Sequence, residues 1–148
     1  MNSWLHRPAH IADTLNMDRG KLSKTAHIEK FKRCPCCKVW MSSIEIMEDP
    51  SIEIEGMGMG DNGSVNLFFF THRRQNCNTT FAIPAESLEP FIDEEIPPEI
   101  LMGTSDCEHR CMHICDLQVC SQPCRYATFR RFLVKILARK REQMSNSV

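Results

Sequence analysis

The chain has 148 residues, 42% hydrophobic and 25% charged, a composition typical of one soluble globular domain that can bury an ordinary core. The longest apolar run, residues 67–70, is far shorter than the ~18 residues of a membrane-spanning helix. No apolar segment of a signal peptide is visible near the N-terminus. We therefore expect a cytoplasmic protein that does not bind membranes and whose cysteines stay reduced.

The net charge of −1 conceals an uneven distribution. Residues 1–44 carry eight Lys/Arg against three Asp/Glu, residues 45–100 carry two against twelve, and residues 101–148 carry eight against four. Both ends are basic and the middle is acidic. The basic ends either pack near the acidic middle or contact a partner, which we expect to be a protein, with nucleic acid as the alternative. The pattern does not define an oligomeric state.

In chain order, the pattern divides into four segments. Residues 1–33 form a basic, weakly ordered arm; residues 34–84 form a zinc-ribbon-like β region; residues 85–106 form a linker; and residues 107–148 form a cysteine-rich metal segment plus a C-terminal helix. Within the β region, strands are predicted over residues 39–46, 51–55, 65–71 and 79–83, with a Gly-rich turn over residues 56–63.

The strongest helix prediction covers residues 121–142. Ser121 is the expected N-cap, and Pro123 then falls in the first turn, where its missing N–H costs little. Apolar residues recur at helical spacing at Phe129, Phe132, Leu133, Ile136 and Leu137. The linker is expected to contain a helical turn near residues 85–91.

A first metal site is indicated by Cys34 and Cys37, whose two-residue gap lets two thiolates bind one tetrahedral zinc ion. His72 and Cys77 follow about 40 residues later and are expected to complete it, with Cys36 as a substitute ligand. Two other interpretations stay open. One is a redox dithiol of the Cys-Pro-x-Cys type, and the other is a set of free cysteines.

A second, denser cluster lies between residues 107 and 124 and holds five of the nine cysteines. Its expected metal ligands are Cys107, Cys111, Cys120 and Cys124, with His113 and Cys115 as substitutes. The predicted helix would place Cys120 and Cys124 on one face of its first turn. Four thiolates suit structural zinc or an iron–sulfur cluster, and disulfides or unliganded thiols are the remaining alternatives.

Four features of the sequence occur together: Cys34-Pro-x-Cys37, residues 49–56, residues 69–72 leading to Cys77 and residues 78–82, and Cys107-x3-Cys111-x-His113-x6-Cys120-x3-Cys124 followed by Ala127. In combination they resemble a family of small, uncharacterised bacterial proteins that are rich in cysteine and zinc-ribbon-like. In this chain Asn78 stands where the family pattern has Gly, His72 lies further from Cys77, and Cys36 and Cys115 are additional. The resemblance implies metal binding and a bacterial origin.

The predicted fold is α+β: a small antiparallel zinc-ribbon-like β-sheet, then a cysteine-rich segment and a C-terminal amphipathic helix. We expect a cytosolic metal-binding protein, with zinc as the metal, that acts as an adaptor or regulator without catalysis. The alternative is an iron–sulfur or thiol-based redox or sensor protein. A catalytic zinc enzyme would need an open coordination position and a nearby base, for which Glu108 and Asp116 are the acids inside the second cluster.

Overall fold

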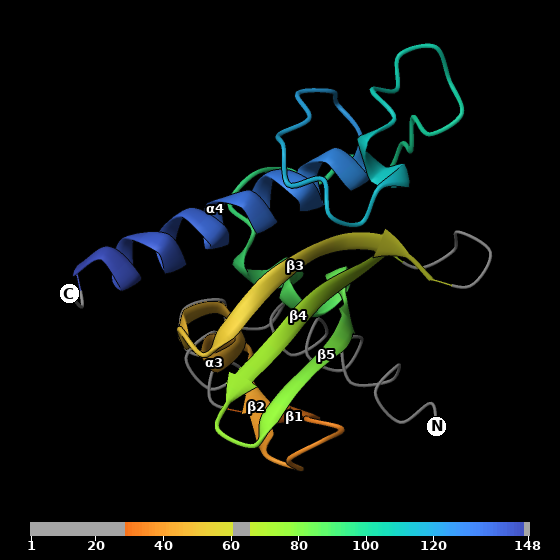
Figure 1. The fold of residues 1–148 in the computed structure, drawn as a ribbon. Coiled ribbons are helices and arrows are strands. Elements are labelled where there is room, and N and C mark those ends of the chain that lie inside the picture. The colour runs from red at the N-terminus through yellow and green to blue at the C-terminus, as the bar shows by residue number, and fades with distance from the viewer. Residues whose placement is uncertain (1–28, 61–65, 147–148) are drawn as a thin grey trace.

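The computed structural model describes residues 29–60 and 66–146 and shows an α+β fold of two small antiparallel sheets and a long C-terminal helix (Figure 1). Most of the predicted basic arm, residues 1–28, lies outside the described residues. The elements in order are β1 (Lys30–Arg33), β2 (Trp40–Ser42), α3 (Ser43–Glu48), β3 (Ile52–Met59), β4 (Asn66–Arg74), β5 (Cys77–Pro84), the 3₁₀ helices η2 (Ala85–Phe91) and η3 (Arg110–Met112), and α4 (Arg125–Asn146).

The two sheets differ in size. Strands β1 and β2 pair only with each other, while β3, β4 and β5 form a three-stranded antiparallel sheet in that order. Strand β1 uses residues that the sequence pattern assigns to the arm. A two-stranded hairpin is marginal by itself in water, so β1 and β2 depend on the rest of the molecule.

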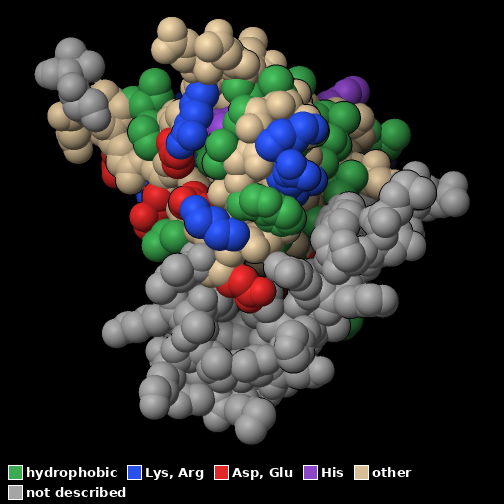
Figure 2. Space-filling model, turned by 90° about the horizontal axis from the view of Figure 1, so that it is seen from below, with side chains coloured by type: hydrophobic (Ala, Val, Ile, Leu, Met, Phe, Trp, Pro, Cys, Tyr) green, Lys and Arg blue, Asp and Glu red, His purple; other side chains and the backbone are tan. Residues whose placement is uncertain are grey.

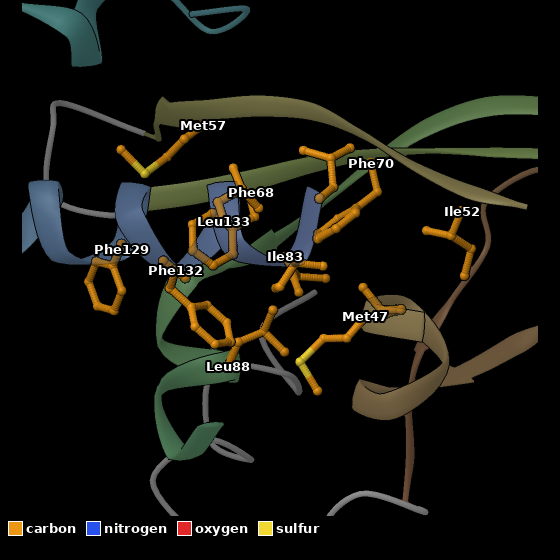
Figure 3. Packing of buried hydrophobic residues seen from close by; sticks show 14 of the residues in the cluster. Met47, Ile52, Met57, Phe68, Phe70, Ile83, Leu88, Phe129, Phe132 and Leu133 are labelled. Carbon is orange, nitrogen blue, oxygen red and sulfur yellow. The ribbon is translucent and has the colours of Figure 1, made fainter. Parts of the chain in front are cut away.

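Helix α4 covers the three-stranded sheet and contributes much of the core. Figure 3 shows side chains of α4 lying against those of the sheet and of η2, and the rings of Phe68 and Phe129 meet edge to face with centroids 6.2 Å apart. The buried helix positions Phe129, Phe132, Leu133 and Ile136 are those expected from the helical spacing. A bilayer-crossing helix, which needs both length and an apolar sequence, is absent from the described residues.

The predicted strand over residues 39–46 is wrong in its second half. Strand β2 ends at Ser42, and residues 43–48 form helix α3. The cause is a capping box: Ser42 Oγ accepts a hydrogen bond from the Glu45 N–H, and the Glu45 carboxylate accepts one from the Ser42 N–H. Two otherwise unpaired donors are satisfied, which starts the helix despite the alternating sequence.

The predicted Gly-rich turn also begins too early. Strand β3 continues to Met59, so Gly56 and Gly58 lie within the sheet. Gly56 is needed there because the carbonyl oxygen of Ile114 would lie 1.6 Å from a Cβ at this position. That carbonyl accepts a hydrogen bond from the Met57 N–H at 3.1 Å, which joins the cysteine-rich loop to the edge of the sheet.

Helix α4 starts at Arg125, four residues later than predicted. Ser121 and Pro123 therefore precede the helix and do not form its first turn. Cys120 also lies outside the helix, and Cys124 lies immediately before it. The predicted placement of these two cysteines one helical turn apart is thus wrong, and their positions depend on loop structure.

Candidate metal centre

Four residues from two distant parts of the chain converge at one point. One ligand atom from each of Cys34, Cys37, His72 and Cys77 lies within 4.8 Å of all the others. Cys34, His72 and Cys77 are buried, and Cys37 is half-buried. This group matches the first predicted set of ligands, and Cys36 is exposed beside it.

The turn between β1 and β2 presents the two cysteines of the first pair. The N–H of Cys34 donates to the carbonyl of Val39 at 2.8 Å, and the N–H of Lys38 donates back to the carbonyl of Cys34 at 3.0 Å. Lys38 has a left-handed backbone, with φ of 67°, which lets the chain reverse within this short segment. Both Cys34 and Cys37 therefore lie on one tight loop.

The hairpin of β4 and β5 presents the other two ligands. His72 pairs with Thr79 across the two strands, and Cys77 lies two residues from Thr79. Residues two apart on a strand face the same side, so His72 and Cys77 are diagonal neighbours on one face of the sheet. Asn76, with φ of 65°, supplies the left-handed residue of the turn, a conformation that Asn tolerates well.

The distances between these atoms fit a tetrahedral metal ion. Cys34 Sγ and Cys77 Sγ are 3.6 Å apart, Cys37 Sγ and His72 Nδ1 are 3.5 Å apart, and Cys77 Sγ and His72 Nδ1 are 3.6 Å apart. Zinc with Zn–S bonds of about 2.3 Å and Zn–N bonds of about 2.0 Å would place tetrahedral ligands about 3.5–3.8 Å apart. All nine cysteines are free thiols, and 3.6 Å is far too long for a disulfide bond.

The surroundings of Cys34 stabilise a thiolate. Burial alone would raise the pKa of Cys34, but hydrogen bonds from the Cys37 N–H, the His72 side chain and the Cys36 N–H outweigh it and lower the pKa to about 6. Burial raises the pKa of Cys77 to about 12, and its hydrogen bond with Cys34 adds to that rise. One thiolate is thus already favoured, and a bound cation would favour the others.

Basic side chains lie at this end of the molecule, and several of them are paired with acids: Lys30 with Glu45, Arg73 with Glu53, and Arg74 with Asp49. Figure 2 shows Lys and Arg beside Asp and Glu and among hydrophobic side chains on this face, which is the lower end of Figure 1, where β1 and β2 lie. Trp40 is 50% exposed and Val39 is 39% exposed, both next to the metal-binding turn. The exposed basic residues of β1, of the turn and of the end of β4 are Lys30, Arg33, Lys38, Arg73 and Arg74.

The second predicted set of ligands is brought together more loosely. Cys107, Cys111, Cys120 and Cys124 line one pocket between the cysteine-rich loop and the start of α4. Among the described residues, no three of these thiols have sulfur atoms that all lie within 4.8 Å of one another. The predicted substitutes His113 and Cys115 are exposed, and neither lines the pocket.

Two cations of α4 are buried although neither belongs to the apolar positions that define the buried face in the sequence analysis. Arg130 is 1% exposed and Lys140 is 4% exposed. Lys140 Nζ donates to the carbonyl oxygen of Asp49 at 2.8 Å, which ties α4 to the end of α3. Helical spacing could have indicated their burial. Arg130 follows the buried Tyr126 by four residues, and Lys140 follows the buried Ile136 by four, so each cation lies on the same side of the helix as a buried residue.

Comparison with protein-family models, with curated proteins and with solved structures found no match to this chain. The class of site is therefore defined by its own geometry: a Cys₃His cluster with the spacing of a metal-binding site.

Proposed function

We propose that this chain is a zinc-binding protein in which Cys34, Cys37, His72 and Cys77 hold one structural zinc ion. The observation that supports this most strongly is the set of three ligand-atom distances of 3.5–3.6 Å, which fits a tetrahedral zinc shell. Four protein ligands leave no coordination position for water or substrate, so the site is structural and not catalytic. The two-hairpin arrangement supports the further proposal that this part of the chain is a zinc-ribbon-like module.

The ion would fasten the two sheets to each other. Two ligands come from the turn between β1 and β2, and two come from the β4–β5 hairpin. The β1–β2 hairpin is too small to be stable alone, so its folding free energy would come largely from the metal. Loss of zinc should release this hairpin before the larger sheet unfolds.

The role that we propose for the module is that of a cytoplasmic adaptor or regulator. Trp40 and Val39 are exposed on the metal-binding turn, and Arg33 and Lys38 are exposed close by. An exposed aromatic ring among cations suits a protein partner or a nucleic acid. Direct binding to DNA or RNA that falls steeply as salt rises would identify a nucleic-acid partner, and no binding to either at low salt would favour a protein partner. Reduced thiols persist in the cytoplasm, which fits nine free cysteines.

A thiol-based redox or sensor protein is the second candidate. The 3.6 Å between Cys34 Sγ and Cys77 Sγ would let a disulfide form after a small movement. Both thiols are buried, however, at 0% and 3% exposure, and redox-sensing cysteines are usually accessible. Burial favours the metal site over the dithiol.

The test uses two adjacent cysteines that differ in their role. Cys37 is a proposed ligand, while Cys36 is exposed and outside the group. Full-length protein and Cys36→Ser should both keep their zinc during dialysis against a zinc chelator, whereas Cys37→Ser, which has a weaker site, should end with one zinc ion fewer per chain. Equal zinc contents in all three proteins would refute the proposed site. A Cys34–Cys77 disulfide in protein purified without reductant would favour the redox candidate.

A further inference from the structure

A pocket at the other end of the chain is surrounded by four thiols. Its space is small, about 20 Å³, and its wall includes Cys107, Cys111, Cys120 and Cys124 together with apolar residues before and after them. Cys120 and Cys124 are each 7% exposed, and the other two are half-buried. In Figure 1 the loops that carry these residues lie beside the N-terminal end of α4.

The loop that carries these thiols is held by hydrogen bonds to β3 and α4 and has little secondary structure of its own. Between residues 107 and 124 the only helix or strand is η3, three residues long. Met112, Ile114 and Val119 are exposed at 66%, 46% and 50%, so few apolar side chains anchor the loop. Ordering this many residues costs about 1–2 kcal/mol each in backbone entropy. A crosslink through the pocket would offset that cost, and the thiols are not paired as disulfides.

Backbone N–H groups already point at two of the sulfur atoms. The Leu101 N–H donates to Cys124 Sγ at 3.3 Å, and the His109 N–H donates to Cys107 Sγ at 3.3 Å. Hydrogen bonds of this kind stabilise metal-bound thiolates and tune their metals. Cys34 receives the same kind of bond in the first site.

A buried cation beside the pocket forms no direct salt bridge with the described residues. Arg130 is 1% exposed, and the Asp116 carboxylate interacts with it electrostatically without forming a salt bridge. Its guanidinium donates to the carbonyl oxygens of Arg110 and Asp116, and its Nε is buried without a partner. An unpaired buried charge is costly. A metal centre with four thiolates keeps a net negative charge, which would compensate this cation.

From these observations we infer that Cys107, Cys111, Cys120 and Cys124 form a second metal centre, separate from the first and made of four thiolates. Zinc and an iron–sulfur cluster share this ligand chemistry. No three of the sulfur atoms lie within 4.8 Å of one another, so they must move closer to share one zinc ion, whereas a cluster would bind each cysteine through a different iron atom. Cys120 Sγ now donates to the Glu108 carboxylate at 3.3 Å, so this thiol must lose its proton and this contact when the metal binds.

The experiment measures metals and sulfide in full-length protein purified without oxygen. We expect either two zinc ions per chain, or one zinc ion with iron, acid-labile sulfide and visible absorption; the first result identifies zinc in the second centre and the second identifies a cluster. The double variant Cys111→Ser/Cys124→Ser should lose the second metal and keep one zinc ion. Cys115→Ser, an exposed cysteine of the same loop, should keep both. One metal per chain in the wild type, or a double variant with the wild-type metal content, would overturn the inference.

A second measurement does not depend on how the variant folds. Native wild-type protein is treated with an alkylating reagent, and the modified cysteines are identified by mass spectrometry. The four pocket thiols should react at least tenfold more slowly than Cys115, and a chelator or, for a cluster, an oxidant should abolish this difference. Half-buried Cys107 and Cys111 decide the result, because burial alone would not protect them. Reaction of these two at the rate of Cys115 would refute a metal centre there.

Discussion

His72 Nδ1 lies 3.6 Å from Cys77 Sγ although the two residues are separated by a hairpin turn. The turn residues Gln75 and Asn76 set the register that places both side chains on the same face. The four residues between His72 and Cys77 are therefore a hairpin turn and the strand ends beside it. Cys34 and Cys37, in contrast, are separated by two residues of one tight loop. This relationship makes the His72 imidazole the most informative ligand to change.

Replacement of His72 by Ala should remove one of four zinc ligands. Structural zinc binding is worth roughly 10–16 kcal/mol, so one ligand contributes about 3 kcal/mol, or on the order of 100-fold in affinity. His72→Cys should retain zinc binding, because four thiolates also form a stable tetrahedral site. Competition with a chromophoric chelator measures both variants. Equal zinc affinity of His72→Ala and wild type would show that the imidazole is not a ligand.

Replacement of Gly56 by Ala should destabilise the protein through one contact. The added methyl group would lie 1.6 Å from the carbonyl oxygen of Ile114, so the strand or the loop must move, at a cost of about 1–3 kcal/mol. Gly103→Ala is the control, since its φ of 88° is also unfavourable but nothing lies within 4 Å. Urea denaturation measures both free energies of unfolding. If Gly56→Ala lowers the free energy of unfolding no more than Gly103→Ala does, residue 56 does not lie as close to the Ile114 carbonyl as described.

Lys140 should make stability depend on alkaline pH. Burial lowers the pKa of Lys140 to about 8, below its value of about 10.5 in the unfolded chain. Between these two values the unfolded chain binds the proton and the folded chain does not, so the free energy of unfolding rises with pH. Below about pH 8 Lys140 is protonated in both the folded and the unfolded chain, so its contribution to the free energy of unfolding no longer changes with pH.

The measurement for Lys140 compares urea denaturation of wild type and Lys140→Met at about pH 7.5 and about pH 10. The wild type should gain stability relative to Lys140→Met as the pH rises. Lys135→Met, on the exposed side of the same helix, should show no such change relative to wild type. A difference between wild type and Lys140→Met that stays constant with pH would mean that the folded-state pKa is not lowered.

The start of helix α3 should depend on the Ser42 hydroxyl. Ser42→Ala removes the acceptor for the Glu45 N–H, and N-cap replacements cost about 0.5–2 kcal/mol. Ser121→Ala is the matched control, because Ser121 caps no helix in this fold; its effect should stay within about 0.5 kcal/mol. Thermal or urea denaturation gives both values. A larger loss for Ser121→Ala would indicate that α4 begins near residue 121.

The grouping of Cys34, Cys37, His72 and Cys77 matches the first predicted ligand set, because each of its two pairs lies in a short local motif. Cys34 and Cys37 lie within one turn, and the strands that carry His72 and Cys77 have strong β propensity. The α+β class is confirmed for the same reason, since the strands and the final helix have clear periodicity. The Gly-rich segment was misassigned because Gly56 is required by a contact with Ile114, 58 residues away, which no local pattern records.

The second cluster was harder to predict because loop structure determines it. The cap predicted at Ser121 required a helix through Pro123, but α4 begins only after Cys124. The carbonyl groups of this loop instead receive hydrogen bonds from Arg130 and Arg131 of α4. Helical spacing can place a cation such as Arg130 on the buried stripe, but no sequence pattern indicates which distant carbonyl groups it binds.

Crystallography with anomalous diffraction at the zinc edge tests the central proposition most directly. We predict a strong anomalous peak about 2.3 Å from the sulfur atoms of Cys34, Cys37 and Cys77 and about 2.0 Å from Nδ1 of His72. Crystals of zinc-containing protein with no peak at this position, or with a bond between Cys34 Sγ and Cys77 Sγ, would contradict it.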